Sequence, residues 1–175
     1  MKKRTFTAIL FLFVSACAFA AGPSKKDVMR AISVLETDVT GPKAAEAAKT
    51  IVAFAQASDD VMVDFGPVQL PWVDEKWGLG QEKEQSLKSL LVAAFVAGNI
   101  RSQIKNDLVE DDTYSGWIFV IDVYHHLREA TPFTSPSVEA LEKMQAEGTL
   151  RRHAKDAHAQ TDREEAPEPG RKGPV

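Results

Sequence analysis

QSLKSLLVAAFVAGNIRSQIKNDL, residues 85–108, is the stretch of the chain that decides the fold class. Apolar residues recur in it three and four positions apart, which is the spacing of one face of an α-helix. We predict a helix over about 82–108 with a broad buried face. That face comprises Leu87, Leu90, Leu91, Ala94, Phe95, Ala97, Ile100, Ile104 and Leu108.

The same period recurs on both sides of this stretch. It predicts further helices over about 24–37, 42–57, 114–130 and 136–147. Proline in the first turn and glycine after the last turn mark several of their ends. We therefore predict an all-α domain over residues 21–150, built as an antiparallel bundle or a short stack of helical hairpins with about five or six helices.

Two segments between these helices leave alternatives open. Residues 61–65 fit either a further helical turn or a short strand. Residues 66–80 are irregular and contain Trp72 and Trp77. A connection of this length is usually functional or packed down. The two tryptophans therefore either seal the helical core or form a lip that binds a partner.

Residues 151–175 have the composition of a disordered tail. They contain no aromatic residue and no Leu or Ile, so they cannot bury enough apolar surface to offset the entropy lost on ordering. We predict disorder from residue 151 onward. His153 and His158 lie in this tail at a spacing that suits no single metal ion on a helix, and we assign them no role.

The N-terminus has the features of a secretory signal peptide. Lys2, Lys3 and Arg4 precede an apolar run over 6–14 that is too short to span a bilayer, and Ala18-Phe19-Ala20 follows as a cleavage signal. We predict a signal peptide over residues 1–20 and a periplasmic or secreted protein.

Cys17 gives an alternative to simple cleavage. Val14-Ser15-Ala16-Cys17 is similar to a lipobox, in which Cys17 would be acylated and would tether the protein to the membrane. Cleavage after Ala20 would instead leave a chain without cysteine, which forms no disulfide. Both interpretations stay open.

The charge of the chain argues against a nucleic-acid partner. Loss of Lys2, Lys3 and Arg4 with the signal peptide leaves 18 Lys and Arg against 25 Asp and Glu, a net charge of −7. An acidic domain repels phosphate backbones. No later segment is apolar enough for a transmembrane helix.

Asp122, His126 and Glu129 are the residues whose spacing best fits a chemical site. Separations of four and three residues place them on one face of the helix predicted over 114–130. They suit half of a metal site or a hydrolytic centre, and equally an ordinary solvated face. Because no second helix offers a matching histidine, we predict neither a metal nor a cofactor.

These observations lead to three functional interpretations. The first is a non-enzymatic interaction or accessory module that binds another exported or envelope protein, with Trp72 and Trp77 as candidate contacts. The second is a metal-binding or hydrolytic enzyme that uses Asp122, His126 and Glu129. The third is an immunity or inhibitor protein directed against an exported toxin.

Overall fold

The computed structural model describes residues 22–165, with side chains as far as 159, and confirms the all-α prediction. The signal peptide predicted over 1–20, Cys17 included, lies outside the described residues, as do residues 166–175. The described chain forms six helices and no strand. They are α1 (Lys25–Asp38), α2 (Ala44–Ala57), α3 (Gln81–Asn106), α4 (Thr113–Ala130), α5 (Pro136–Ala146) and α6 (Leu150–Glu165).

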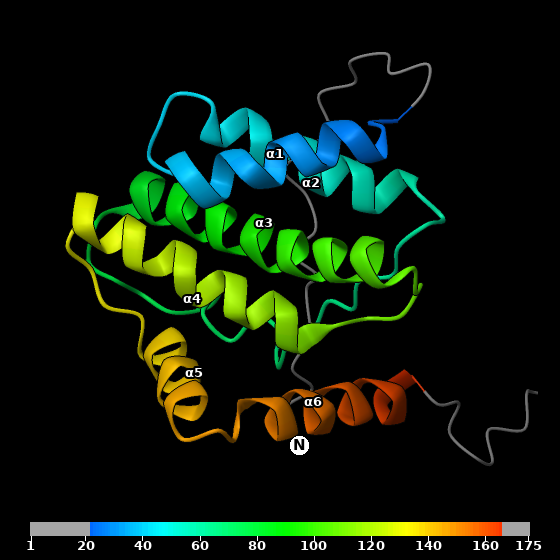
Figure 1. Ribbon diagram of the computed structural model, residues 1–175. Coiled ribbons are helices and arrows are strands. Elements are labelled where there is room, and N and C mark those ends of the chain that lie inside the picture. The colour runs from blue at the N-terminus through cyan, green and yellow to red at the C-terminus, as the bar shows by residue number, and fades with distance from the viewer. Residues whose placement is uncertain (1–21, 166–175) are drawn as a thin grey trace, which may run out of the picture.

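The helices are arranged around a central pair (Figure 1). Helices α3 and α4 lie side by side in the middle, the α1–α2 hairpin covers α3 on one side, and α5 and α6 lie on the far side of α4. Residues 93–100 of α3 are all buried, because α3 has neighbours on both sides. A helix in that position is apolar around most of its circumference.

Side-chain caps fix where several helices begin. The Ser24 hydroxyl accepts the amide N–H of Asp27 at 3.2 Å, and the Asp27 carboxylate accepts the N–H of Ser24 at 3.1 Å, which completes a capping box. Asp112 caps α4 by accepting the N–H of Ser115 at 3.0 Å. Caps of this kind satisfy amide groups that the helix itself leaves unpaired.

Glycines at the crossing of α3 and α4 allow their backbones to approach closely. A Cβ on Gly98 would lie 2.3 Å from the Ser115 carbonyl oxygen and 2.8 Å from the Phe119 Cβ. A Cβ on Gly116 would lie 2.6 Å from the Phe95 ring. Helix α3 runs through Gly98 without interruption, so the glycine serves packing there.

Substitution of Gly98 by alanine should therefore destabilise the fold. The added methyl group meets a backbone carbonyl that moves only if α3 and α4 separate, and overpacking of this kind costs about 1–3 kcal/mol. Urea denaturation of Gly98→Ala measures the loss, with Ser86→Ala on the exposed side of the same helix as the control. Equal unfolding midpoints for the two variants would contradict the close approach.

Two predictions from the sequence are wrong, one at the end of α3 and one in the loop after α2. Leu108 was predicted on the buried face of the longest helix, but α3 ends at Asn106 because Asp107 takes a left-handed conformation with φ 53°. Leu108 is consequently 57% exposed. Residues 61–65, for which helix and strand were both open, form neither.

The predicted start of the disordered tail at residue 151 is wrong, and the rest of that tail, residues 166–175, lies outside the described residues. Residues 150–165 form α6, whose buried side chains Leu150, Ala154 and Ala157 share one face. Alanine carries a weak hydropathy signal, yet it lets one helix pack closely on another at little entropic cost. The ordered domain therefore extends past the predicted boundary at residue 150.

Candidate functional site

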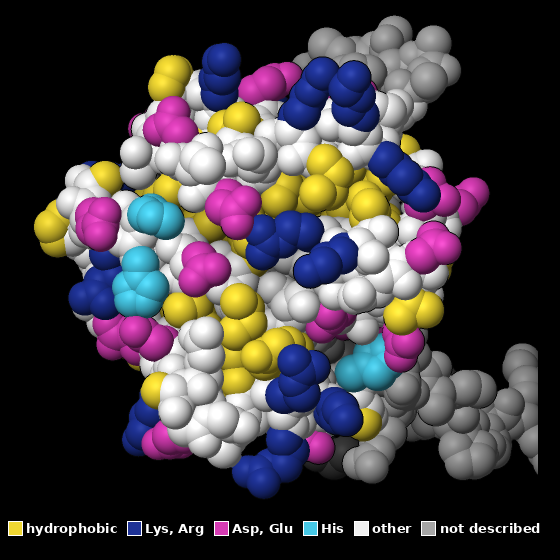
Figure 2. All heavy atoms as spheres, viewed as in Figure 1, with side chains coloured by type: hydrophobic (Ala, Val, Ile, Leu, Met, Phe, Trp, Pro, Cys, Tyr) yellow, Lys and Arg dark blue, Asp and Glu magenta, His cyan; other side chains and the backbone are white. Residues whose placement is uncertain are grey.

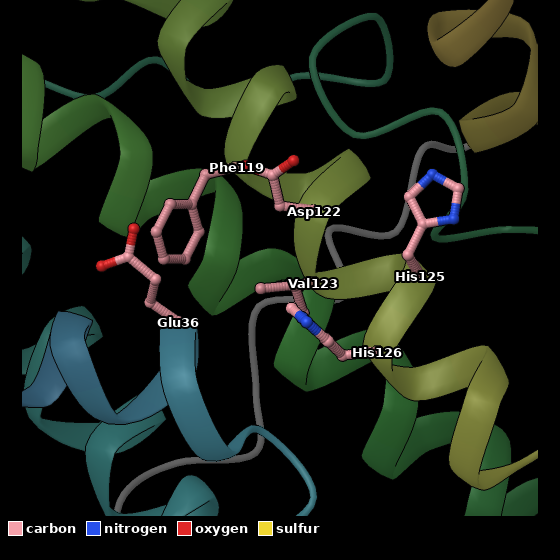
Figure 3. Close-up of a pocket in the computed structure, with 6 residues that line it drawn as sticks. All are labelled: Glu36, Phe119, Asp122, Val123, His125 and His126. Carbon is pink, nitrogen blue, oxygen red and sulfur yellow. The ribbon is translucent and has the colours of Figure 1, made fainter.

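The three residues singled out by spacing do not converge. Asp122, His126 and Glu129 are all exposed on α4. Asp122 and His126 border a hollow of about 320 Å³, but Glu129 does not (Figure 3). The residues that line the hollow are Glu36, Phe119, Asp122, Val123, His125 and His126.

The polar groups of this hollow are dispersed or already paired. Glu36 forms an ion pair with Arg101 at 2.7 Å. The His125 ring points to the opposite side of α4 from Glu36 in Figure 3, and its Nε2 lies 3.2 Å from the Glu142 carboxylate. Although the Asp122 side chain reaches solvent, partial desolvation by its neighbours raises its pKa above the ordinary value, against the attraction of Arg101. Two of the polar groups around the hollow, Glu36 and His125, are thus engaged with side chains of neighbouring helices.

The loop that carries the two tryptophans is packed down. Trp72 is fully buried, which favours the alternative that it seals the helical core. The loop is also tied to α4, since the Trp117 indole N–H donates to the Gln69 carbonyl at 2.8 Å. Trp77 is half-buried and packs on Phe133, with ring centroids 4.7 Å apart.

Glu75 fastens the same loop to the start of α5. Its carboxylate accepts the Ser135 hydroxyl at 2.6 Å, the Ser137 N–H at 2.8 Å and the Trp77 indole N–H at 2.9 Å. Burial acts to raise the pKa of Glu75, but these hydrogen bonds outweigh it and hold the pKa below its ordinary value. The ionised form therefore stabilises the fold.

Glu75→Gln should lower the free energy of unfolding at neutral pH. Glutamine keeps one acceptor but turns an N–H donor toward groups that already donate, at a cost of about 1–2 kcal/mol. Because the folded-state pKa of Glu75 is lowered, its stabilisation is fully present above the ordinary pKa of 4.5 and is lost as the pH falls through the folded-state value.

Thermal unfolding of both proteins between neutral and acidic pH tests this dependence on pH. The stability difference should stay constant down to about pH 5 and shrink below it. Glu110→Gln, at an exposed loop position outside the helices, is the matched control and should show no such difference. A Glu75→Gln difference that persisted unchanged into strong acid would mean that the ionised carboxylate is not its source.

A buried polar network ties two loops to the C-terminal end of α3. The Gln103 side chain accepts the Met62 N–H at 2.9 Å and donates to the Met62 carbonyl at 2.6 Å. The Asn99 side chain bridges Gln103 and Asp111, and Asp111 accepts the Asp64 N–H at 3.0 Å. Asn99 and Gln103 are buried, so these bonds fix residues 61–65 and 107–112 beside each other.

Four exposed large apolar side chains lie on these two loops, and we call this set the end patch. It consists of Met62, Phe65, Leu108 and Val109, whose exposures are 43%, 52%, 57% and 58%. They are four of the six large apolar side chains exposed in the described part of the chain. At the right-hand end of the molecule, where α3 ends, Figure 2 shows a small apolar area with acidic side chains above and below it.

Beside the end patch, three potential metal ligands converge. One ligand atom from each of Asp64, Asp111 and His158 lies within 4.8 Å of the others, and no other such group occurs among residues 22–159. Asp122, His126 and Glu129 therefore do not form such a group of ligands. Sequence analysis missed this group because its members come from two loops and α6, and because α6 was predicted to be disordered.

None of the six helices combines the length and the apolar character needed to cross a membrane, as far as the described residues go. No family model, curated protein or solved structure matches the chain.

Proposed function

We propose that the protein is an exported, non-enzymatic interaction module that binds another exported or envelope protein through the end patch. The observation that supports this most directly is the gathering of Met62, Phe65, Leu108 and Val109 in solvent on two adjacent loops. Exposed apolar groups scattered singly need no explanation, whereas a cluster rimmed by polar residues is typical of a binding surface.

The buried network beneath the end patch adds to the argument. Gln103 bonds the backbone of Met62 with its side chain, and its carbonyl accepts the N–H of Leu108 at 3.2 Å. Both loops are thus held in place before any partner arrives. A pre-organised surface loses less conformational entropy on binding, which increases affinity for a given contact area.

Charge around the end patch defines the chemistry of the partner. Asp59, Asp107 and Glu110 are exposed on the same two loops, and Asp60 beside them forms an ion pair with Lys25 at 3.3 Å. A complementary surface carries apolar side chains bordered by Lys and Arg, since opposite potentials speed association and exclude wrong partners. An inhibitor of an exported toxin is the special case in which the partner is that toxin.

Site-specific photocrosslinking in growing cells tests the binding surface. A photoreactive residue in place of Leu108 should give a discrete adduct with one partner. The same residue in place of Val73 is the control, because Val73 is the exposed apolar residue on the tryptophan loop. Absence of an adduct at position 108, or the same adduct from both positions, would contradict the proposal.

Export is proposed from the N-terminal sequence alone and has its own test. The intact mass of the purified protein should correspond to a chain that begins at Ala21. Incorporation of labelled palmitate that disappears in Cys17→Ser would show instead that the protein is a membrane-anchored lipoprotein. A chain that retains residues 1–20 would contradict both interpretations.

A further inference from the structure

We propose that Asp64, Asp111 and His158 form a binding site for a divalent transition-metal ion of the Zn²⁺ class. The three residues come from the loop after α2, the loop before α4 and the third turn of α6. Their ligand atoms lie within 4.8 Å of one another, and all three residues are half-buried. This inference does not depend on the proposed function.

The separations suit one ion after a small closure. Zn²⁺ binds histidine nitrogen and carboxylate oxygen at about 2.0–2.2 Å, which places ligand atoms about 3.3–3.6 Å apart in a tetrahedral site. His158 Nδ1 and the Asp64 carboxylate are already 3.0 Å apart. The third ligand atom lies at most 4.8 Å from the other two, so it has to approach them by no more than about 1.2 Å to reach that spacing.

Asp111 is held by the outer interactions that a metal ligand usually has. Its Oδ1 accepts the Asp64 N–H and the Asn99 amide, and its Oδ2 accepts the N–H and the hydroxyl of Thr113. Hydrogen bonds of this kind orient ligating carboxylates. A hydroxyl proton can turn about its C–O bond, whereas a backbone N–H cannot, so the Thr113 hydroxyl is the donor that an ion would displace from Asp111.

The ligand set selects the class of ion. Imidazole nitrogen favours Zn²⁺ and similar ions, whereas Mg²⁺ and Ca²⁺ prefer oxygen alone. Two carboxylates balance the charge of a divalent ion. Three protein ligands leave a fourth position open for water or for a donor from another molecule. An ion here would join α6 to the loops that carry Phe65 and Val109.

Zinc titration of the purified, chelator-treated protein tests the site. Calorimetry should show one equivalent of Zn²⁺ bound, and excess Zn²⁺ should raise the unfolding temperature, because a ligand that binds only the folded state stabilises it. Asp64→Asn and His158→Gln should each weaken Zn²⁺ binding by at least about 10–100-fold. A loss of that size already follows when a residue that only hydrogen-bonds a metal ligand is replaced. His126→Gln, in the hollow beside Asp122, should bind as the wild type does.

A further variant keeps the test valid if His158→Gln is unstable. His158→Cys replaces one metal ligand by another, so it should retain binding and give a thiolate-to-metal absorption band with Co²⁺ that the wild type lacks. Failure of the wild type to bind one equivalent would overturn the proposal. So would unchanged affinity in Asp64→Asn and His158→Gln, or loss of binding in His126→Gln alone.

Discussion

Trp72→Ala is expected to lower the free energy of unfolding by about 3–5 kcal/mol, the usual cost of removing a buried large aromatic side chain. Trp72 is fully buried although it lies in an irregular loop. The substitution would leave a cavity beneath residues 66–80, where the surrounding loop is fixed by the Trp117–Gln69 and Glu75–Ser135 hydrogen bonds. Chemical denaturation followed by tyrosine and tryptophan fluorescence measures the loss.

Two controls separate packing from other contributions of this residue. No acceptor among the described residues bonds the Trp72 indole N–H, so Trp72→Phe forfeits volume but no hydrogen bond and should cost less than the alanine variant. Trp77→Ala should also cost less, because Trp77 is only half-buried. Equal destabilisation by Trp72→Ala and Trp77→Ala would contradict the sealing role of Trp72.

Ending the chain after Gly148 is expected to destabilise the domain strongly. The truncation removes α6 with its buried residues Leu150, Ala154 and Ala157. It also uncovers two aromatic rings. The Trp117 and His153 rings stack with their centroids 5.2 Å apart, and the Tyr114 ring centroid lies 4.0 Å from the Arg151 guanidinium carbon. Loss of the leucine alone would cost about 2–5 kcal/mol.

The matched control for this truncation ends the chain after Glu165. It keeps all six helices and every contact described for α6. Its urea midpoint should equal that of the full chain, while the shorter form should unfold at lower urea concentration and bind more of a dye that reports exposed apolar surface. Equal midpoints for the two truncations would mean that α6 contributes nothing to the fold.

The sequence was sufficient to predict the fold class and most of the helices. Periodic apolar residues predicted the extents of α3 and α4 to within a few residues, and Ser24 and Ser135 cap the helices that they precede. These features are local, because the helical repeat and its caps depend on residues within a few positions of each other.

Features that depend on packing were not predictable in the same way. The helical period continues through Leu108, but the left-handed turn at Asp107 takes that residue out of the helix. The burial of α6 rests on two alanines and a leucine, a pattern too weak to distinguish from a polar tail. For the same reason the group of Asp64, Asp111 and His158 was invisible, since its members are separated by up to 94 residues.

The site predicted on α4 shows that residues can share a helix face, as predicted, without forming a site. Asp122 and His126 do share one side of the helix, as their spacing predicted, and both border the hollow in Figure 3. Spacing on one helix says nothing about what the neighbouring helices contribute. Here α1 supplies Glu36, which is engaged with Arg101, and among the described residues no further metal ligand converges with the pair.

The claim that the end patch binds a partner is tested most directly by affinity recovery from the native cell. Three forms are compared, namely the wild type, Leu108→Ser/Val109→Ser and Val73→Ser. All should have equal stability within about 0.5 kcal/mol, because the replaced side chains are exposed. The account predicts one polypeptide that copurifies with the wild type and with Val73→Ser, and whose recovery falls at least about tenfold with the double variant, a change of about 1.4 kcal/mol. Equal recovery with all three forms would contradict it.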